Sequence, residues 1–375
     1  MMKKILLFVI FLLFLTFSSV KVNAIDDYTT EKSSEINNIY ISGDAGNFIS
    51  ENDISVSETE GIMNITPDMV FKYIWQNFKN SLSKPFKMLV IIFIVVILAT
   101  FSEGIGDISN KSGMTKIYNT LCVIACIGAI IYYIKDSLYE ASQTIEDSGV
   151  FMLSYIPVFS GIVATGGGVT TATSYQLIVV FAAEMFVSLS SEIIMPLLSL
   201  CLSAGIVESI NPSISLSGIV KGISKAVKII MGLSLTVFSG LITVQSLVGT
   251  ATDSVALRTG KFVVSNLVPV VGNAVSDAYS TVKGSIGILR NATGAFGVIA
   301  IFLIVIPPII SVFSTTLCVY IGELFADIFS VKPISSFLKI AYNTMSVCLS
   351  VMICFAMMFF ISTTIVMMVA FNIGV

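Results

Sequence analysis

Long runs of uncharged, apolar residues are the feature that most limits how this chain can fold. A helix needs about 20 such residues to cross the hydrocarbon core of a bilayer. The chain as a whole is 55% hydrophobic and 11% charged, a composition outside that of ordinary water-soluble domains. We therefore expect an all-α, multi-pass bundle of membrane helices. The apolar runs are residues 85–101, 116–134, 149–165, 175–206, 226–250, 295–321 and 342–371.

The N-terminus has the pattern of a secretory signal peptide. Lys3 and Lys4 precede an apolar core, and residues 1–24 end in Val22-Asn23-Ala24, where small residues suit a cleavage site. A retained membrane anchor is the alternative. In either case we expect residues 25–65 to be exported, because the sequence there is acidic and poor in lysine, the opposite of a cytoplasmic loop. Its polar composition predicts a loosely ordered segment.

Residues 66–84 have the periodicity of a short amphipathic helix. Thr66, Pro67 and Asp68 make a plausible helix start, and the single tryptophan, Trp75, follows. Tryptophan favours the headgroup level of a membrane, so we predict an interfacial helix, with docking onto protein as the alternative. Residues 85–375 would then form the transmembrane bundle.

The fourth apolar run, residues 175–206, is too long for one simple span. We predict a tight hairpin broken near Glu192 or Pro196. This also places the three lysines that follow, at positions 221, 225 and 228, on the cytoplasmic side, as the positive-inside rule favours. A single long crossing is the alternative.

Two further features predict irregular structure within the membrane. Pro307 and Pro308 lie in the middle of the sixth run, and because they remove two backbone donors, we expect the helix to kink or break there. Carbonyl groups freed in this way must find partners in protein or water. Glu184 lies within the fourth run, where a carboxyl group usually faces the bundle interior or a water path.

Residues 245–297 differ from the rest of the chain, because apolar residues alternate there with sparse charges and glycines. Both arginines of the chain, Arg258 and Arg290, fall inside this segment. We predict a broken or re-entrant membrane element, of the kind that lines binding sites; a solvated amphipathic hairpin is the alternative. The candidate structural or conduit residues, including those named above, are Glu184, Asp253, Arg258, Lys261, Asn266, Pro269, Gly272, Asp277, Arg290, Asn291, Pro307 and Pro308.

The residue inventory argues against an enzyme. The sequence contains no histidine, the usual general base and commonest metal ligand, and it has no phosphate-binding loop of the Walker type. Gly104-Ile105-Gly106-Asp107 resembles an element of intramembrane aspartyl proteases, but the second aspartate in its usual context is missing. We expect no catalytic residue, cofactor or metal. A net charge of −3 without a basic patch also argues against nucleic-acid binding.

The polar segment resembles the signature stretch of the stage III sporulation protein AE family. The resemblance is carried by Gln245-Ser246-Leu247, Lys261-Phe262, Pro269-Val270-Val271-Gly272, Ser276-Asp277-Ala278 and Arg290-Asn291-Ala292. The signal peptide, exported segment and multi-pass layout extend it over most of the chain. No residue-level catalytic role comes with the resemblance.

This resemblance implies a membrane component of the channel complex that links mother cell and forespore in endospore-forming bacteria. The protein would lie in the mother-cell-derived membrane around the forespore, with its mature N-terminus outside the cytoplasm. Implied partners are other membrane and extracellular proteins of the complex and a separate secretion-type ATPase; whether the chain also forms a homo-oligomer is left open. The alternatives are a stand-alone secondary transporter and a structural membrane scaffold.

For the polar segment itself we expect internal ion pairs or a conduit lining. The residues concerned are Asp253, Arg258, Lys261, Asp277 and Arg290.

Overall fold

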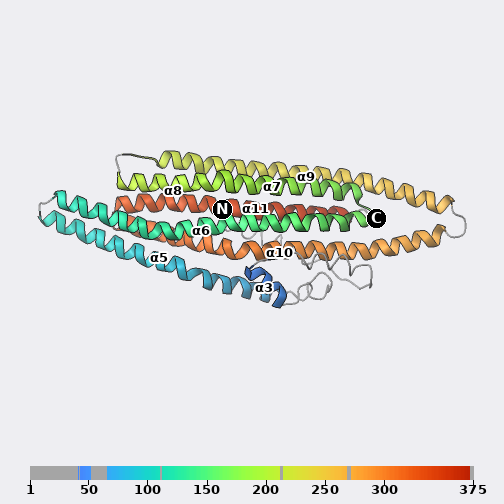
Figure 1. Cartoon of the computed structure of the whole chain (residues 1–375), viewed down its shortest axis with the longest axis horizontal. Coiled ribbons are helices and arrows are strands. Elements are labelled where there is room, and N and C mark those ends of the chain that lie inside the picture. Colours follow the sequence, from blue (N-terminus) through green and yellow to red (C-terminus); the bar gives the residue numbers. More distant parts are fainter. Residues whose placement is uncertain are drawn as a thin grey trace.

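Long helices, each antiparallel to the next along the chain, form one elongated bundle (Figure 1). The computed structural model describes residues 41, 43–51, 66–109, 112–211, 214–267 and 272–371. Within this part, six helical segments are long and apolar enough to cross a bilayer, if α7, a π-helical segment and α8 count as one. The elements are α3 (Gly43–Glu51), α5 (Pro67–Ser109), α6 (Ser112–Thr165), α7 (Val169–Ser188), the π segment η1 (Leu189–Ile194), α8 (Met195–Ile210), α9 (Ser217–Leu267), α10 (Gly272–Ile328) and α11 (Lys332–Phe371).

The expectation of an all-α bundle with several spans is therefore confirmed, but two of the seven apolar runs belong to one helix. The runs at residues 116–134 and 149–165, with the acidic stretch between them, form the single 54-residue helix α6. The stretch stays helical because its small and apolar residues recur every three or four positions and are buried. They are Ser137, Leu138, Ala141, Thr144, Ile145 and Ser148.

The helix predicted at residues 66–84 begins where expected but does not end there. The backbone N–H of Met69 lies 3.4 Å from the Thr66 hydroxyl oxygen and 3.0 Å from its carbonyl oxygen, so Thr66 caps the helix. α5 then continues through Pro85 to Ser109. One buried face, which includes Tyr73, Asn77, Met88, Ile92 and Val96, runs through both halves and keeps them in one helix.

The hairpin predicted near Glu192 or Pro196 is wrong. α7 passes through the π segment into α8 without reversing direction, and the residues at both junctions keep right-handed helical dihedral angles. The irregularity does fall at the expected place. Pro196 has no N–H to donate to Glu192, and Met195 donates instead to the carbonyl of Ser190, five residues earlier, as in a π-helix.

Of the kink or break expected at Pro307 and Pro308, the break is absent, because α10 is continuous from Gly272 to Ile328. The structure likewise shows no re-entrant element in the described parts of residues 245–297. They form the end of α9 and the start of α10, which extend beyond the neighbouring helices at one end of the bundle (Figure 1). The signal peptide, most of the exported segment and Pro269 lie outside the described residues.

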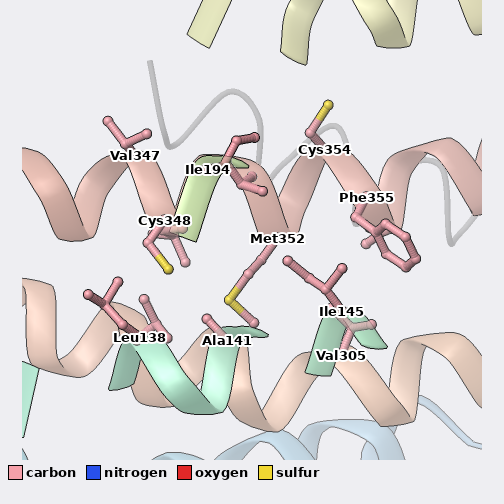
Figure 2. Close-up of a cluster of buried hydrophobic side chains, with 14 of the residues drawn as sticks. Leu138, Ala141, Ile145, Ile194, Val305, Val347, Cys348, Met352, Cys354 and Phe355 are labelled. Atoms are coloured by element: carbon pink, nitrogen blue, oxygen red, sulfur yellow. The ribbon is translucent and has the colours of Figure 1, made fainter. Parts of the chain in front are cut away.

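The core lies among α6, α10 and α11, which pack on one another, while α5 packs on one side and α7, α8 and α9 on the other (Figure 1). Figure 2 shows Met352 of α11 reaching towards Ala141 and Ile145 of α6, whereas Cys354 points to the opposite side of the same helix. The Cys354 thiol lies 3.4 Å from the carbonyl oxygen of Met231 in α9. α11 therefore joins the two sides of the bundle.

Alternating helix directions predict a definite topology. With all native cysteines replaced, single cysteines at Gly168 and Ser276 should report one side of the membrane, and those at Ser217 and Ser330 the other. An exported N-terminal segment makes the first pair accessible to a membrane-impermeant thiol reagent in intact cells and the second pair accessible after permeabilisation. Labelling of Gly168 and Ser217 from the same side would contradict the six-span arrangement.

Candidate functional site

The polar segment starts at a buried carboxylate that holds two helices together. Asp253 of α9 is only 3% exposed. Its two carboxylate oxygens accept hydrogen bonds from the backbone N–H groups of Thr170 and Thr171, both at 2.9 Å, and from the Thr171 hydroxyl at 2.8 Å. Both threonines lie in the first turn of α7.

This arrangement is a helix cap supplied by another helix. The first N–H groups of any helix lack partners within it, and the local cap residue of α7, Gly168, offers no side-chain bond. A carboxylate is favoured at this place because it meets the positive end of the helix dipole. Asp253 therefore supplies both the hydrogen bonds and the negative charge that the first turn of α7 needs.

The same face of α9 fits α7 over two further turns. Gln245, Gly249 and Asp253 are four residues apart and thus share one side of the helix. The Gln245 amide donates to the Ser174 hydroxyl at 2.9 Å. A Cβ atom on Gly249 would lie 2.9 Å from the Cα of Thr171, so only glycine permits this approach. The turn before α7 also needs glycine, because Gly167 has a φ angle of 92°.

A second polar contact replaces one of the hydrogen bonds that α10 loses at its prolines. Pro307 cannot donate to the carbonyl of Leu303, four residues earlier, and Pro308 has no N–H for it either. The Tyr73 hydroxyl of α5 donates to this carbonyl at 3.1 Å. The expectation that a carbonyl freed by the prolines finds a partner in the protein is thus confirmed at Leu303, without a break in the helix.

Polar side chains continue along α10 towards its C-terminal end. The Ser311 hydroxyl donates to the Glu140 carboxylate of α6 at 2.7 Å. One turn further, the hydroxyl groups of Thr315 and Ser137 share a hydrogen bond of 3.0 Å. Glu140, not Glu184, is therefore a carboxyl group that faces a neighbouring helix.

A third contact lies where α6 crosses the start of the apolar part of α10. The Tyr155 hydroxyl donates to the carbonyl of Thr293 at 2.9 Å. Its ring is stacked between Phe151 and Phe159, with centroids 5.5 Å away on each side. A Cβ atom on Gly297 would lie 2.2 Å from the Tyr155 ring, so the ring occupies the space that the glycine leaves.

The structure separates the two arginines by environment. Arg258 is exposed near the end of α9, and Arg290 is buried at 9% exposure in α10. Asp253, which we expected in an ion pair or a conduit lining, is instead engaged by the threonine donors of α7. Elsewhere, Lys84 and Asp136 form an ion pair at 2.9 Å, which is largely exposed and therefore of little energetic weight.

The remaining candidates fall into four groups. Asn291, Pro307 and Pro308 are partly buried in α10. Glu184 is exposed on α7, so of the two environments expected for it, the bundle interior and a water path, it does not lie in the first. Pro269 lies outside the described residues. The last group belongs to α9 or α10 by backbone, but the structure does not describe their side chains; it comprises Lys261, Asn266, Gly272 and Asp277.

The described residues contain no cluster of three or more aspartate, glutamate or cysteine side chains placed to hold a metal ion. The cysteines whose side chains the structure describes, Cys126, Cys201, Cys318, Cys348 and Cys354, are buried and form no disulfide, as expected of membrane-core residues. What the described residues form at these places is a set of hydrogen bonds between helices, made by carboxylate, amide and hydroxyl side chains.

The sequence alone did not predict which residues contact the candidate site residues. Thr170 and Thr171 follow the triple glycine at positions 166–168, a turn signal placed just before a helix start, and this was the available clue to a capped terminus. Tyr73 and Glu140 carried no comparable signal, because each is defined by a residue more than 170 positions away.

Comparison with known proteins agrees with the resemblance seen in the polar segment. The family model described as stage III sporulation protein AE matches residues 51–370. The stage III sporulation protein AE of Bacillus subtilis (strain 168) is 23% identical over 280 residues, covering 75% of this chain and 70% of that protein. No significant match to a solved structure was found.

Removal of the Asp253 carboxylate should loosen α7 from α9. Asp253→Ala leaves buried backbone donors without an acceptor, and we expect the free energy of unfolding to fall by about 2 kcal/mol. Thr252→Ala is the matched control, since Thr252 is exposed and bonds only within its own helix. Thermal unfolding in one detergent gives the comparison, and equal midpoints for the two variants would disprove the cap.

Two glycines of α9 should respond in opposite ways to one methyl group. Gly249→Ala pushes a Cβ against the α7 backbone and should destabilise the protein by about 1–3 kcal/mol. Gly240→Ala meets no atom within 4 Å and should be neutral or stabilising by up to about 1 kcal/mol. The same unfolding assay tests both, and similar losses would show that the close approach is not formed.

A double-mutant cycle tests the link between Tyr73 and Pro307. Tyr73→Phe leaves the Leu303 carbonyl without a donor, so we expect a loss of about 1–3 kcal/mol. In a Pro307→Ala background the restored N–H can bond that carbonyl, and the same change should cost less than half as much. Strictly additive losses would rule out the proposed compensation.

Proposed function

Because the chain belongs to the stage III sporulation protein AE family, we propose that it is the membrane component of a channel complex between mother cell and forespore. It would lie in the mother-cell-derived membrane around the forespore and support late forespore development. Other membrane and extracellular proteins, with a separate ATPase, would supply the rest of the complex. The role is non-enzymatic.

The observation that carries this proposal is the filled interior of the bundle. Seven large aromatic side chains are each less than 2% exposed, and several of their rings contact one another between α6, α7 and α11. They are Tyr155, Phe159, Tyr175, Phe186, Phe337, Phe355 and Phe359. A passage through one copy would have to displace these rings, so a conduit is better placed between this chain and other subunits.

The outer helices offer surface for such contacts. In the most apolar 18-residue stretch of α9, only 22% of the stretch is buried inside the bundle, compared with 56% in the corresponding stretches of α6 and α11. Exposed apolar side chains follow α9 for much of its length, among them Leu233, Val237, Leu241 and Val244. This face can meet lipid, another subunit or a second copy of the chain.

The longest helices of the bundle are longer than one bilayer is thick. At about 1.5 Å per residue, the 57 residues of α10 span about 85 Å, against a hydrocarbon core of about 30 Å. The α9–α10 pair extends from one end of the bundle and the α5–α6 pair from the other (Figure 1). We propose that these ends meet the extracellular and cytoplasmic partners respectively.

Charge reversal at the exposed Arg258 tests this role. In a sporulating host that depends on this chain, Arg258→Glu should lower heat-resistant spore counts by at least about tenfold, because a reversed charge opposes a complementary partner surface. The protein level in the membrane should stay normal. Arg258→Lys keeps the charge and serves as the matched control. Full sporulation and unchanged co-purification of partners with Arg258→Glu would contradict a partner surface at this position.

Reconstitution separates the proposal from a stand-alone transporter. Liposomes containing only the purified chain should show no saturable solute uptake driven by a proton or sodium gradient. Uptake without any partner protein would favour the transporter instead.

A further inference from the structure

A cleft between the start of α9 and α11 has a lining that suits an anion. It is lined by Lys221, Ser224, Lys225, Lys228 and Ile229 of α9 and by Asn343 of α11, with a volume of about 410 Å³. This volume is in the range of small-ligand sites. None of these residues belongs to the polar junctions described above.

The three lysines give the cleft an uncompensated positive charge. Their positions, 221, 225 and 228, put them on one face of α9, and all three are exposed. No carboxylate of the described residues lies within 4 Å of their ammonium groups, where such a pair would count as a salt bridge. Glu208, at the preceding turn, is engaged by the backbone N–H of Leu216 at 2.7 Å.

Ser224 adds a buried polar group that lacks a partner. The residue is 8% exposed, and its hydroxyl oxygen forms no hydrogen bond with any described residue. Buried hydroxyl groups are normally bonded, since leaving one unpaired is costly. Together with the lysine ammonium groups and the Asn343 amide, it forms a set of donors that an oxygen-rich anion would satisfy.

The position along the helices indicates where this anion comes from. After Lys228, α9 is uncharged through residue 252, and after Lys339, α11 is uncharged to its end. Twenty-four residues of helix in α9 measure about 36 Å, enough to cross the hydrocarbon core of about 30 Å. The cleft therefore lies at headgroup depth, and exposed Ile229, Ile230 and Leu233 follow it towards the acyl chains.

We infer that the cleft binds the phosphate group of an anionic phospholipid headgroup. Phosphate oxygens would accept from Lys221, Lys225 and Lys228, and Ser224 would donate its unpaired hydroxyl hydrogen. Ile229 would contact the glycerol end of the lipid. Basic pockets between membrane helices bind acidic lipids by this chemistry. The inference holds whether or not the chain acts in a channel.

The test uses the full chain purified in a non-ionic detergent. Binding of phosphatidylglycerol and of phosphatidylcholine is measured by native mass spectrometry for wild type and for the triple variant Lys221→Gln, Lys225→Gln, Lys228→Gln. We expect wild type to prefer phosphatidylglycerol and the triple variant to bind it about tenfold to a hundredfold more weakly, since each lysine near an anionic lipid surface changes affinity several-fold. Phosphatidylcholine binding should change by less than about twofold.

Lys332→Gln with Lys339→Gln is the matched control, because both lysines are exposed at the same end of the bundle but do not line the cleft. This variant should bind phosphatidylglycerol as wild type does. Ser224→Ala, which keeps all charges, should weaken binding by a smaller factor. A circular-dichroism melt establishes that each variant is folded.

Three results would overturn the inference. One is unchanged phosphatidylglycerol binding by the folded triple variant. Another is an equal loss in the control pair, which would indicate a general field of positive charge instead of a cleft. The third is saturable binding of inorganic phosphate that displaces the lipid, which would assign the site to free phosphate.

Discussion

The hydrogen-bonding needs of the backbone in an apolar environment govern this structure. Where water is absent, every exposed N–H or carbonyl group must find a partner within the protein. The start of α7 and the proline site of α10 are two places where a helix cannot meet this need alone. At both, a side chain from another helix supplies the missing group: Asp253 for the N–H groups of Thr170 and Thr171, and Tyr73 for the carbonyl of Leu303. At these two sites the same contacts pack the helices and complete their backbone hydrogen bonding.

These hydrogen bonds between helices lie on the elements that support the proposed role. Asp253 lies near the start of the polar segment that resembles the family signature. It belongs to α9, which among the six candidate spans has the least buried apolar stretch. One side of α9 is thus fixed to α7 by directional bonds, whereas the other side is left apolar and outward-facing. A subunit built in this way can present a rigid lateral surface while aromatic side chains fill the described interior of its bundle, which agrees with an assembly whose passage lies between chains.

The sequence predicted the class of fold well and its continuity poorly. Long apolar runs indicated membrane helices, and Thr66 correctly marked the start of α5. Prolines 307 and 308 and the acidic stretch of α6 suggested breaks that are absent. A tertiary contact from Tyr73 replaces one of the bonds lost at the prolines, and a buried stripe containing Ala141 and Ile145 continues through the acidic stretch. Asp253 could be named in advance as a candidate, since charges are rare in this chain. Its partners could not, because they lie over eighty positions earlier and only packing brings them close.

The π segment between α7 and α8 controls the angular register of one long rod. Phe186 and Leu198 are both fully buried, yet in an uninterrupted α-helix at about 100° per residue they would point about 120° apart. The extra residue held in the wide turn at Leu189–Ile194 reduces that difference to about 20°. A relative one residue shorter here, with an ordinary α-helical turn in place of the wide one, would have eleven steps between these positions and would keep the counterparts of Leu198 and Leu202 on the buried face. Sequence comparisons within the family should therefore treat a one-residue gap at this position as loss of the wide turn, which leaves the buried face of α8 in place, and not as a shortened loop.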